Sequence, residues 1–172
     1  MIAGTPKFAA QAIRQASVIG WKATVIINFP SGSVGGTLAP AGLDKSVGVM
    51  VGTINKDILD GSWKDDPAMQ AYRAFLDKYL PGVDITNGSY LTGYQQGIVL
   101  EQILKQCGND LSRKNILAQA KNLKDVVVPT ALPGIKVNTT DTENMIWTQM
   151  RLQRWAGTGW EAFGEVLDAK SE

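Results

Sequence analysis

The chain has 172 residues, of which 44% are apolar and 19% charged, as in an ordinary globular domain. Its 17 lysines and arginines nearly balance its 16 aspartates and glutamates, which argues against nucleic acid as a partner. Histidine is absent and Cys107 is the only cysteine, which excludes Ser-His-Asp and Cys-His catalytic sites, zinc sites built from His and Cys, and an internal disulfide.

The first predicted element is a helix that begins after Thr5 and ends at Gly20. Thr5 stands at an N-cap position, Pro6 suits the first helical residue, and Gly20 suits the end. The side chains expected to form its apolar stripe are Phe8, Ala9, Ala12, Ile13, Ala16 and Ile19. A helix with a full apolar face this early in the chain must pack against other elements.

Two buried strands are predicted next, at 21–28 and 46–54, because both runs are short and continuously apolar or β-branched. Between them, the stretch NFPSGSVGG at 28–36 is rich in glycine, serine and proline and is therefore a loop. A short helical segment is predicted at 34–43. The loop follows a buried strand, and ligands bind outside the carboxyl ends of such strands in open α/β folds.

Three helices are predicted in the middle of the chain. Asp66 caps the first, the second runs over 90–107, and Ser112 caps the third. The side chains expected to be buried are Met69, Tyr72, Phe75, Leu76 and Tyr79 in the first, and Ile116, Leu117, Ala120 and Leu123 in the third. Gly93 and Gly97 lie one turn apart, which predicts that a neighbouring element approaches closely there.

The last part of the chain is predicted to be mostly extended. The stretch DVVVP at 125–129 indicates a short strand, and 145–155 alternates as a strand of a hairpin that returns over 160–167. The side chains expected on one face of the first hairpin strand are Ile146, Thr148, Met150 and Leu152. The order of elements predicts an α/β fold with a parallel sheet.

The glycine-rich loop is the candidate binding site. It lacks the spacing of a Walker loop or a dinucleotide fingerprint. Its main-chain N–H groups, the hydroxyls of Ser31 and Ser33 and the amide of Asn28 can still hold a carboxylate. The helix start at Gly4 and Thr5 also favours an anion. Together these groups indicate a site for a small molecule.

A small α/β enzyme is an alternative to a binding protein, because the sequence contains paired carboxylates. Asp65 and Asp66 form one pair at a helix start, and Asp57 and Asp60 form another in a polar loop. Neither pair has the context of a glycosidase. Without histidine or a reactive cysteine, a catalytic base would have to be Asp, Glu, Lys or Tyr. We therefore predict no catalytic residue, no metal and no cofactor.

Five stretches of the sequence together resemble one protein family. They read TPKFAAQAIRQASVIGWK, SVGGTLAPAGLDKSVGV, SWKDDPAMQAYRAFLDKYLPG, GYQQGIVLEQILKQCGNDLSRKNILAQAKNLKD and ALPGIKVNTT. In this order they resemble the type I periplasmic substrate-binding proteins of ABC transporters, in the branch that takes up branched-chain amino acids and aromatic acids. The resemblance covers essentially the whole chain.

This resemblance implies two Rossmann-like lobes, of which the chain looks like the carboxy-terminal portion. It implies that 1–45 belongs to the second lobe, that 46–128 completes the first, and that 129–172 returns to the second lobe and ends in the hairpin. It also implies that a small carboxylate-bearing ligand is captured between the lobes in the periplasm and delivered to a membrane permease. The start of the chain does not itself resemble a signal peptide.

The ligand contacts that the resemblance implies are Gly4, Thr5, the loop from Asn28 to Ser33, and an aromatic side chain near Tyr90. Some members of the family bind an amino group through an acidic residue in that loop, but NFPSGS has none. The ligand that the resemblance implies is a branched-chain amino acid or an aromatic or other organic acid. The missing acidic residue weakens the case for an α-amino acid, and Phe29 is a candidate ring partner for an aromatic acid.

Two further alternatives stay open. A ligand-sensing domain of a receptor or regulator would share the fold and differ in its partners. Self-association of the chain would cover apolar faces that have no partner within it.

Overall fold

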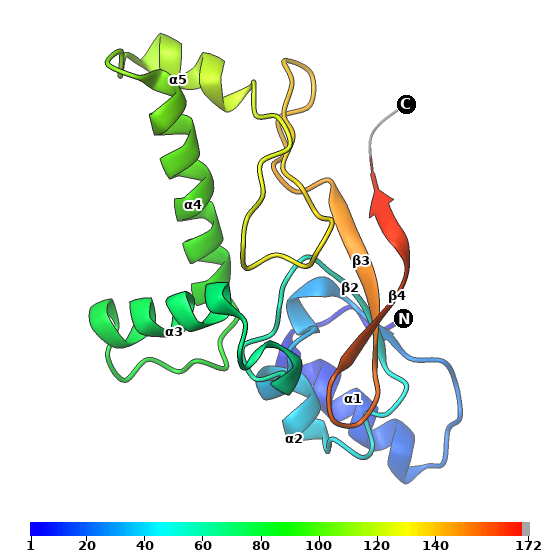
Figure 1. The fold of residues 1–172 in the computed structure, drawn as a ribbon. Coiled ribbons are helices and arrows are strands. Elements are labelled where there is room, and N and C mark those ends of the chain that lie inside the picture. The colour runs from blue at the N-terminus through cyan, green and yellow to red at the C-terminus, as the bar shows by residue number, and fades with distance from the viewer. Residues whose placement is uncertain (170–172) are drawn as a thin grey trace.

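The computed structural model describes residues 1–169. The helices and strands, labelled in Figure 1, are α1 (Pro6–Val18), β1 (Ile26–Ile27), α2 (Ala39–Ala41), β2 (Met50–Thr53), α3 (Pro67–Tyr79), α4 (Ser89–Cys107), α5 (Arg113–Ala120), β3 (Gln149–Trp155) and β4 (Trp160–Asp168). A π-helical turn at Val34–Leu38 leads into α2, and short 3₁₀ turns lie at Phe29–Ser31 and Gly61–Trp63.

The four strands form one open mixed sheet in the order β1-β2-β3-β4. β1 and β2 are parallel, with Ile27 opposite Val51, whereas β2–β3 and β3–β4 are antiparallel. Ile2 adds a parallel bridge to Ile27 beyond the edge of β1. The predicted α/β class is therefore confirmed, and the parallel part of the sheet is limited to its β1 side.

Three clusters of buried side chains hold the described residues together. The first joins α1 and the sheet, where the rings of Trp155 and Trp160 meet edge to face at 5.6 Å. The second joins α4 to the segment that follows α5, around Leu123 and Val137. The third joins α3 to the start of α4 around Tyr72. Figure 1 shows α1 and α2 at one end of the molecule, and α4 and α5 extending away from them.

The helix ends agree well with the sequence because their signals are local. Asp66 accepts a hydrogen bond from the Met69 N–H, and Ser112 accepts one from the Asn115 N–H, so both predicted caps are confirmed. Thr5 occupies the N-cap position of α1, but its side chain makes no cap hydrogen bond. Gly20, with a φ of 68°, follows the last turn of α1 as predicted.

Several predicted buried faces are wrong by part of a turn. Phe8 and Ile19 are more than half exposed, and Ala10 takes a place in the core of α1 instead. Leu117 is 52% exposed on α5, and Tyr79 is exposed at the end of α3. Each helix packs on one side only, so apolar residues at the edges of a stripe remain in water.

Most extended segments are shorter than the sequence predicts: β1 covers two residues of the predicted 21–28 and β2 four of 46–54, whereas β4 extends one residue beyond 160–167. Residues 125–129 form no strand and only a bridge between Val126 and Val137. In the hairpin, Gln153 and Trp155 are buried, whereas the predicted face from Ile146 to Leu152 contains both a buried Thr148 and a Met150 that is 40% exposed. A register shift between Met150 and Leu152 interrupts the alternation.

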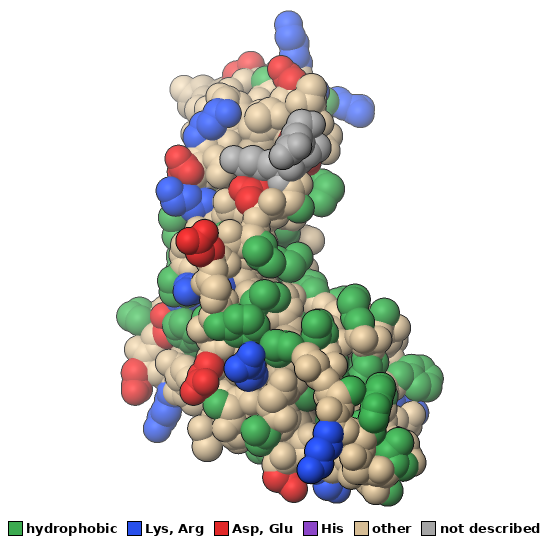
Figure 2. Space-filling model, turned by 90° about the vertical axis from the view of Figure 1, so that its right-hand side faces the viewer, with side chains coloured by type: hydrophobic (Ala, Val, Ile, Leu, Met, Phe, Trp, Pro, Cys, Tyr) green, Lys and Arg blue, Asp and Glu red, His purple; other side chains and the backbone are tan. Residues whose placement is uncertain are grey.

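The predicted close approach at α4 is not made within the described residues. A Cβ added at Gly93 or Gly97 would meet nothing within 4 Å. Figure 2 shows one face of the molecule, on which basic and acidic side chains are interspersed and apolar side chains gather in the lower half. Within 1–169, no helix combines the length and apolar character needed to cross a membrane.

Leu123 tests the second cluster, because its side chain is fully buried beside α4. We expect Leu123→Ala to lower the free energy of unfolding by about 2–5 kcal/mol, since it removes buried methyl groups and leaves a cavity. The matched control Leu117→Ala truncates an exposed leucine six residues away, and we expect a change within about 0.5 kcal/mol. Urea denaturation would measure both, and equal losses would contradict this packing.

Candidate functional site

A cleft of about 570 Å³ lies between the loop after β1 and the turn before α4. Phe29, Pro30 and Ser33 line it from the loop, together with Pro6, Gly32 and Gly36. Its opposite wall consists of Asp84, Thr86, Asn87, Gly88, Ser89 and Thr92. Thr53 and Asn55, at the end of β2, complete the lining. The cleft thus adjoins the carboxyl ends of the two parallel strands, the usual place for a ligand in such a sheet.

A smaller cavity of about 50 Å³ continues the cleft inward. The residues that line both are Gly32, Ser33, Asn55, Thr86, Asn87 and Gly88. The inner cavity adds the polar side chains of Lys56, Asp57, Tyr72 and Gln153, together with Gly35 and the apolar side chains of Ile58, Leu59, Ile85 and Leu91. Burial, together with the nearby phenols of Tyr90 and Tyr94, raises the pKa of Tyr72 to about 12, so its hydroxyl stays protonated at neutral pH.

Two glycines let the loop lie close against its neighbours. A Cβ at Gly32 would stand 2.7 Å from Cγ2 of Val51, and one at Gly35 would stand 2.6 Å from Cδ1 of Leu59. Ser33 then caps the π-helical turn by accepting a hydrogen bond from the Gly36 N–H at 3.0 Å. Close packing therefore explains why glycine occupies positions 32 and 35 of this loop.

Asp57 ties this loop to the segment that follows β2. Its Oδ2 accepts a hydrogen bond from the Val34 N–H at 2.7 Å, and its Oδ1 accepts one from the Leu59 N–H at 2.8 Å. Burial raises the pKa of Asp57, and these two bonds oppose the rise without cancelling it. A carboxylate of the chain itself thus occupies the start of the turn at 34–38.

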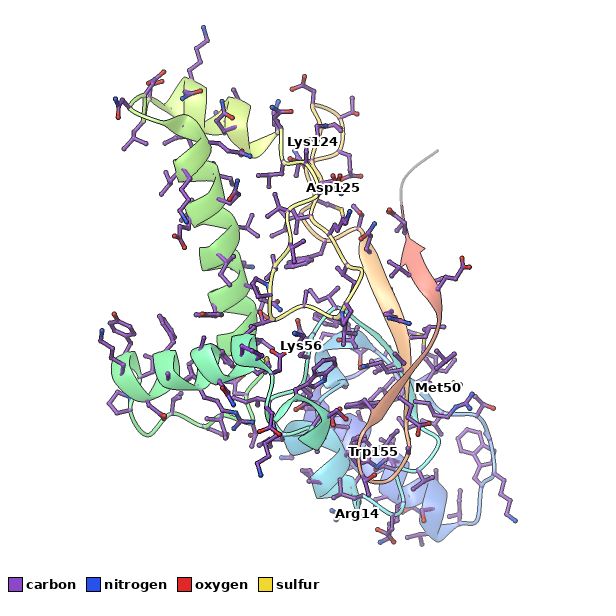
Figure 3. The ribbon with its side chains drawn as sticks, viewed as in Figure 1. Arg14, Met50, Lys56, Lys124, Asp125 and Trp155 are labelled. Carbon is purple, nitrogen blue, oxygen red and sulfur yellow. The ribbon has the colours of Figure 1, made fainter. Side chains whose placement is uncertain are left out.

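Lys56 ties three other segments together. Its Nζ donates hydrogen bonds to Oδ2 of Asp66 at 2.7 Å and to the carbonyl oxygen of Pro129 at 2.8 Å, and it lies 5.0 Å from the centre of the Trp63 ring. The residue is only 7% exposed. Figure 3 shows Lys56 between the start of α3 and the segment that follows α5.

Of the site residues predicted from the sequence, Phe29 and Ser33 line the cleft. Ser31 is fully buried, and its hydroxyl donates a hydrogen bond to the carbonyl oxygen of Gly4 at 2.7 Å. The side chain of Asn28 has a buried Oδ1 without a partner. Ser31 therefore holds the loop against the start of the chain, and a ligand role for these residues stays a prediction.

Thr5 and Tyr90 lie outside this cleft. Thr5 lines a neighbouring hollow beside α1, which shares Pro6 and Gly36 with the cleft. Arg14 and Pro40 also line this hollow, and Arg14 donates a hydrogen bond to the Pro40 carbonyl oxygen. Tyr90 lines an apolar hollow on α4 with Phe75. The structure thus brings together Phe29 and Ser33, joins Gly4 to the loop through Ser31, and leaves Thr5 and Tyr90 apart from them.

Sequence reasoning did not find Asn55, Asp57, Thr86 or Asn87 in this cleft. These residues lie in irregular segments, where no periodic pattern marks a buried side chain. The position of Asn55 and Asp57 just after β2 was the available signal, because ligands bind beyond the ends of parallel strands. Among residues 1–169, no three Asp, Glu or Cys side chains are placed to hold a metal ion.

The sheet and the cleft beside its parallel strands define the fold of the type I periplasmic binding proteins. One solved example is a branched-chain amino acid ABC transporter protein from Thermus thermophilus with bound valine. It has 14% identity and a TM-score of 0.72 over 96% of this chain and 44% of that one. A leucine-binding protein from Thermotoga maritima has 14% identity and a TM-score of 0.66 over 97% and 43%.

The chain belongs to the periplasmic binding protein family, since residues 1–159 match that family's model. A third similar structure is a fatty acid ABC transporter substrate-binding protein from Thermomonospora curvata, with 21% identity and a TM-score of 0.63 over 96% and 42%. No curated protein matches the sequence. The chain spans less than half the length of these three solved proteins.

Replacing Lys56 tests how much its ammonium group contributes to the stability of the fold. We expect Lys56→Met to lower the free energy of unfolding by about 3 kcal/mol, because it leaves Asp66 and the Pro129 carbonyl without their buried partner. The control Lys105→Met breaks an exposed ion pair with Glu101 and should cost less than about 1 kcal/mol. Urea denaturation at pH 7 compares the two, and a Lys56→Met variant as stable as Lys105→Met would contradict the assigned role.

The same pair predicts a pH dependence. Burial disfavours the charged form of Asp66, but the hydrogen bonds from Lys56 and Met69 outweigh it and hold the pKa of Asp66 below its ordinary value of 3.8. Its stabilisation is therefore complete above pH 3.8 and is lost as the pH falls through the lower folded-state pKa. Unfolding followed from pH 6 to pH 2 should show a smaller acid loss in Lys56→Met than in the unchanged protein.

Proposed function

We propose that this chain forms part of the solute-binding component of an ABC importer. In this proposal the cleft captures a small carboxylate-bearing solute in the periplasm, and the protein delivers it to a permease in the membrane. The observation that carries the proposal is the cleft between Phe29 and Ser33 on one side and 84–92 on the other. Membership of the periplasmic binding protein family supports it.

The ligand is proposed to be an aromatic or branched aliphatic acid. The three similar proteins are described as binding or transporting valine, leucine and fatty acid, all of which combine a carboxylate with an apolar body. Phe29 is 37% exposed beside Pro30, and together they offer a flat apolar surface in the cleft. A sensory protein with the same fold would bind the same kind of ligand and differ in its partner.

We propose that 1–45 belongs to the second lobe, that 46–128 completes the first, and that 129–172 returns to the second. α1, β1 and the hairpin share the first cluster, whereas α3 and α4 pack in the other two. β2 pairs with both β1 and β3 and contributes Val51 to the first cluster. Two parts of the chain pack across these proposed boundaries: β2 lies in the sheet of the first cluster, and Val137 packs with α4 in the second cluster.

Ligand binding can be tested with a thermal-shift screen of the full-length gene product. The panel contains amino acids, benzoates, phenylpropanoids and dicarboxylates, and a ligand that binds only the folded state raises the melting temperature. We expect at least one aromatic or branched acid to raise it by several degrees. Phe29→Ala should weaken that ligand by about tenfold, because an aromatic contact contributes roughly 1 kcal/mol beyond its buried area.

The control for this screen is Phe8→Ala. Phe8 is 62% exposed on α1 and does not line the cleft, so its truncation should leave the shift unchanged. A panel in which no acid shifts the melting temperature would contradict uptake of organic acids. Turnover of a metabolite without tight binding would instead favour the enzyme alternative.

The 172-residue chain alone should bind these acids weakly or not at all, because it spans less than half the length of the similar solved proteins. It should also self-associate, since apolar side chains on α3 and α4 such as Tyr79 and Leu100 are more than half exposed. Isothermal titration and sedimentation velocity would measure the two effects. Affinity equal to that of the full-length product, in a monomeric chain, would contradict both expectations.

A further inference from the structure

The loop at 28–36 looks like an anion cradle in sequence, but its donors are used within the chain. The main-chain N–H groups of Ser31, Gly32, Val34, Gly36, Thr37 and Leu38 all donate to acceptors of this chain. The Ser31 hydroxyl donates to Gly4. The Val34 N–H, at the start of the turn, is held by Asp57. Most main-chain donors of this wall are therefore not available to a ligand carboxylate.

Several donors of the opposite wall also bond within the chain. The Thr86 N–H and hydroxyl both donate to Oδ1 of Asp84, and the Ser89 N–H donates to Oδ1 of Asn87. The Thr92 hydroxyl donates to the carbonyl oxygen of Gly88. Donors on both sides of the cleft therefore serve to shape it.

The inner end of the cleft carries acceptors. Oδ1 of Asn55 is buried and has no hydrogen-bond partner. Each carboxylate oxygen of Asp57 accepts one N–H and keeps a further lone pair. The ammonium of Lys56, which also borders this cavity, is directed to Asp66, Pro129 and Trp63. A buried acceptor without a partner is costly unless a ligand or water supplies a donor.

We propose that Asp57 and Asn55 bind a hydrogen-bond donor of the ligand, a hydroxyl or an ammonium group, at the inner end of the cleft. The preferred solutes are then hydroxylated or amino-bearing acids, with the donor placed inward and the carboxylate bound away from the 28–36 loop. This inference rests on the proposed solute-binding function. Tyr72 and Gln153 border the same cavity and can accept as well as donate, so they are compatible with either donor.

Matched ligand pairs test this directly in the full-length gene product. The pairs are benzoate and 4-hydroxybenzoate for a hydroxyl, and 4-methylpentanoate and leucine for an ammonium group. We expect the donor-bearing member of at least one pair to bind ten- to a hundredfold more tightly by isothermal titration, as hydrogen bonds to a charged group contribute. The pair that shows the preference identifies which donor the cavity takes.

Asp57→Asn should reduce that preference to threefold or less while the parent acid keeps its affinity, because the variant retains shape and loses the charge. Asn55→Ala removes the other acceptor, which has no partner within the chain, and should reduce the preference by about tenfold even if Asp57→Asn does not fold. The control Asp65→Asn changes an exposed carboxylate outside the cleft and should keep the preference in full.

Three results would overturn the inference in distinguishable ways. Acids that bind with no preference for a donor overturn it and leave the solute-binding function intact. A preference that survives both Asp57→Asn and Asn55→Ala assigns the donor site elsewhere. A panel in which neither member of any pair binds removes the proposed function, and this inference with it.

Discussion

A buried ammonium is the constraint on which the arrangement around the cleft depends. Lys56 loses most of its hydration, a cost that only close partners offset. It has three: the carboxylate of Asp66, the carbonyl of Pro129 and the face of Trp63. These partners lie at the start of α3, in the segment after α5 and in the turn between β2 and α3, so a single side chain fixes all three relative to the end of β2.

Two aspartates close to Lys56 in the sequence also connect segments of the chain, in their case by accepting hydrogen bonds. Asp57 holds the loop after β1 through the Val34 N–H. Asp60 is 1% exposed and accepts hydrogen bonds from the Ser62 N–H at 2.9 Å and the Trp160 N–H at 3.0 Å. The hairpin is thereby tied to the same short segment. Residues 56–60, which the sequence predicts to be part of a polar loop, thus connect the sheet, the cleft and the helices through their side-chain contacts.

The sequence predicts the helices and their caps well because these signals are local, whereas the predicted strands are longer than those observed. The caps of Asp66 and Ser112 need only the residues that follow them. Which apolar residue is buried is decided by the neighbouring element, and Phe8 and Leu117 were misplaced for that reason. Phe29 and Ser33 were found in the cleft because they lie in a glycine-rich loop, whereas Asn55 and Asp57 have no such pattern around them.

Hydrogen-bond satisfaction changes what the glycine-rich loop can do. Counted as residue types, its serines and main-chain N–H groups favour an anion. Once folded, most of those donors have partners within the chain, and the nearest carboxylate is the protein's own. The groups proposed to recognise the solute then lie at the inner end of the cleft, where the segment after β2 supplies hydrogen-bond acceptors. The residues that give the loop its shape and those that select a solute are therefore different residues, separated in sequence by about twenty positions and brought together by the parallel pairing of β1 and β2.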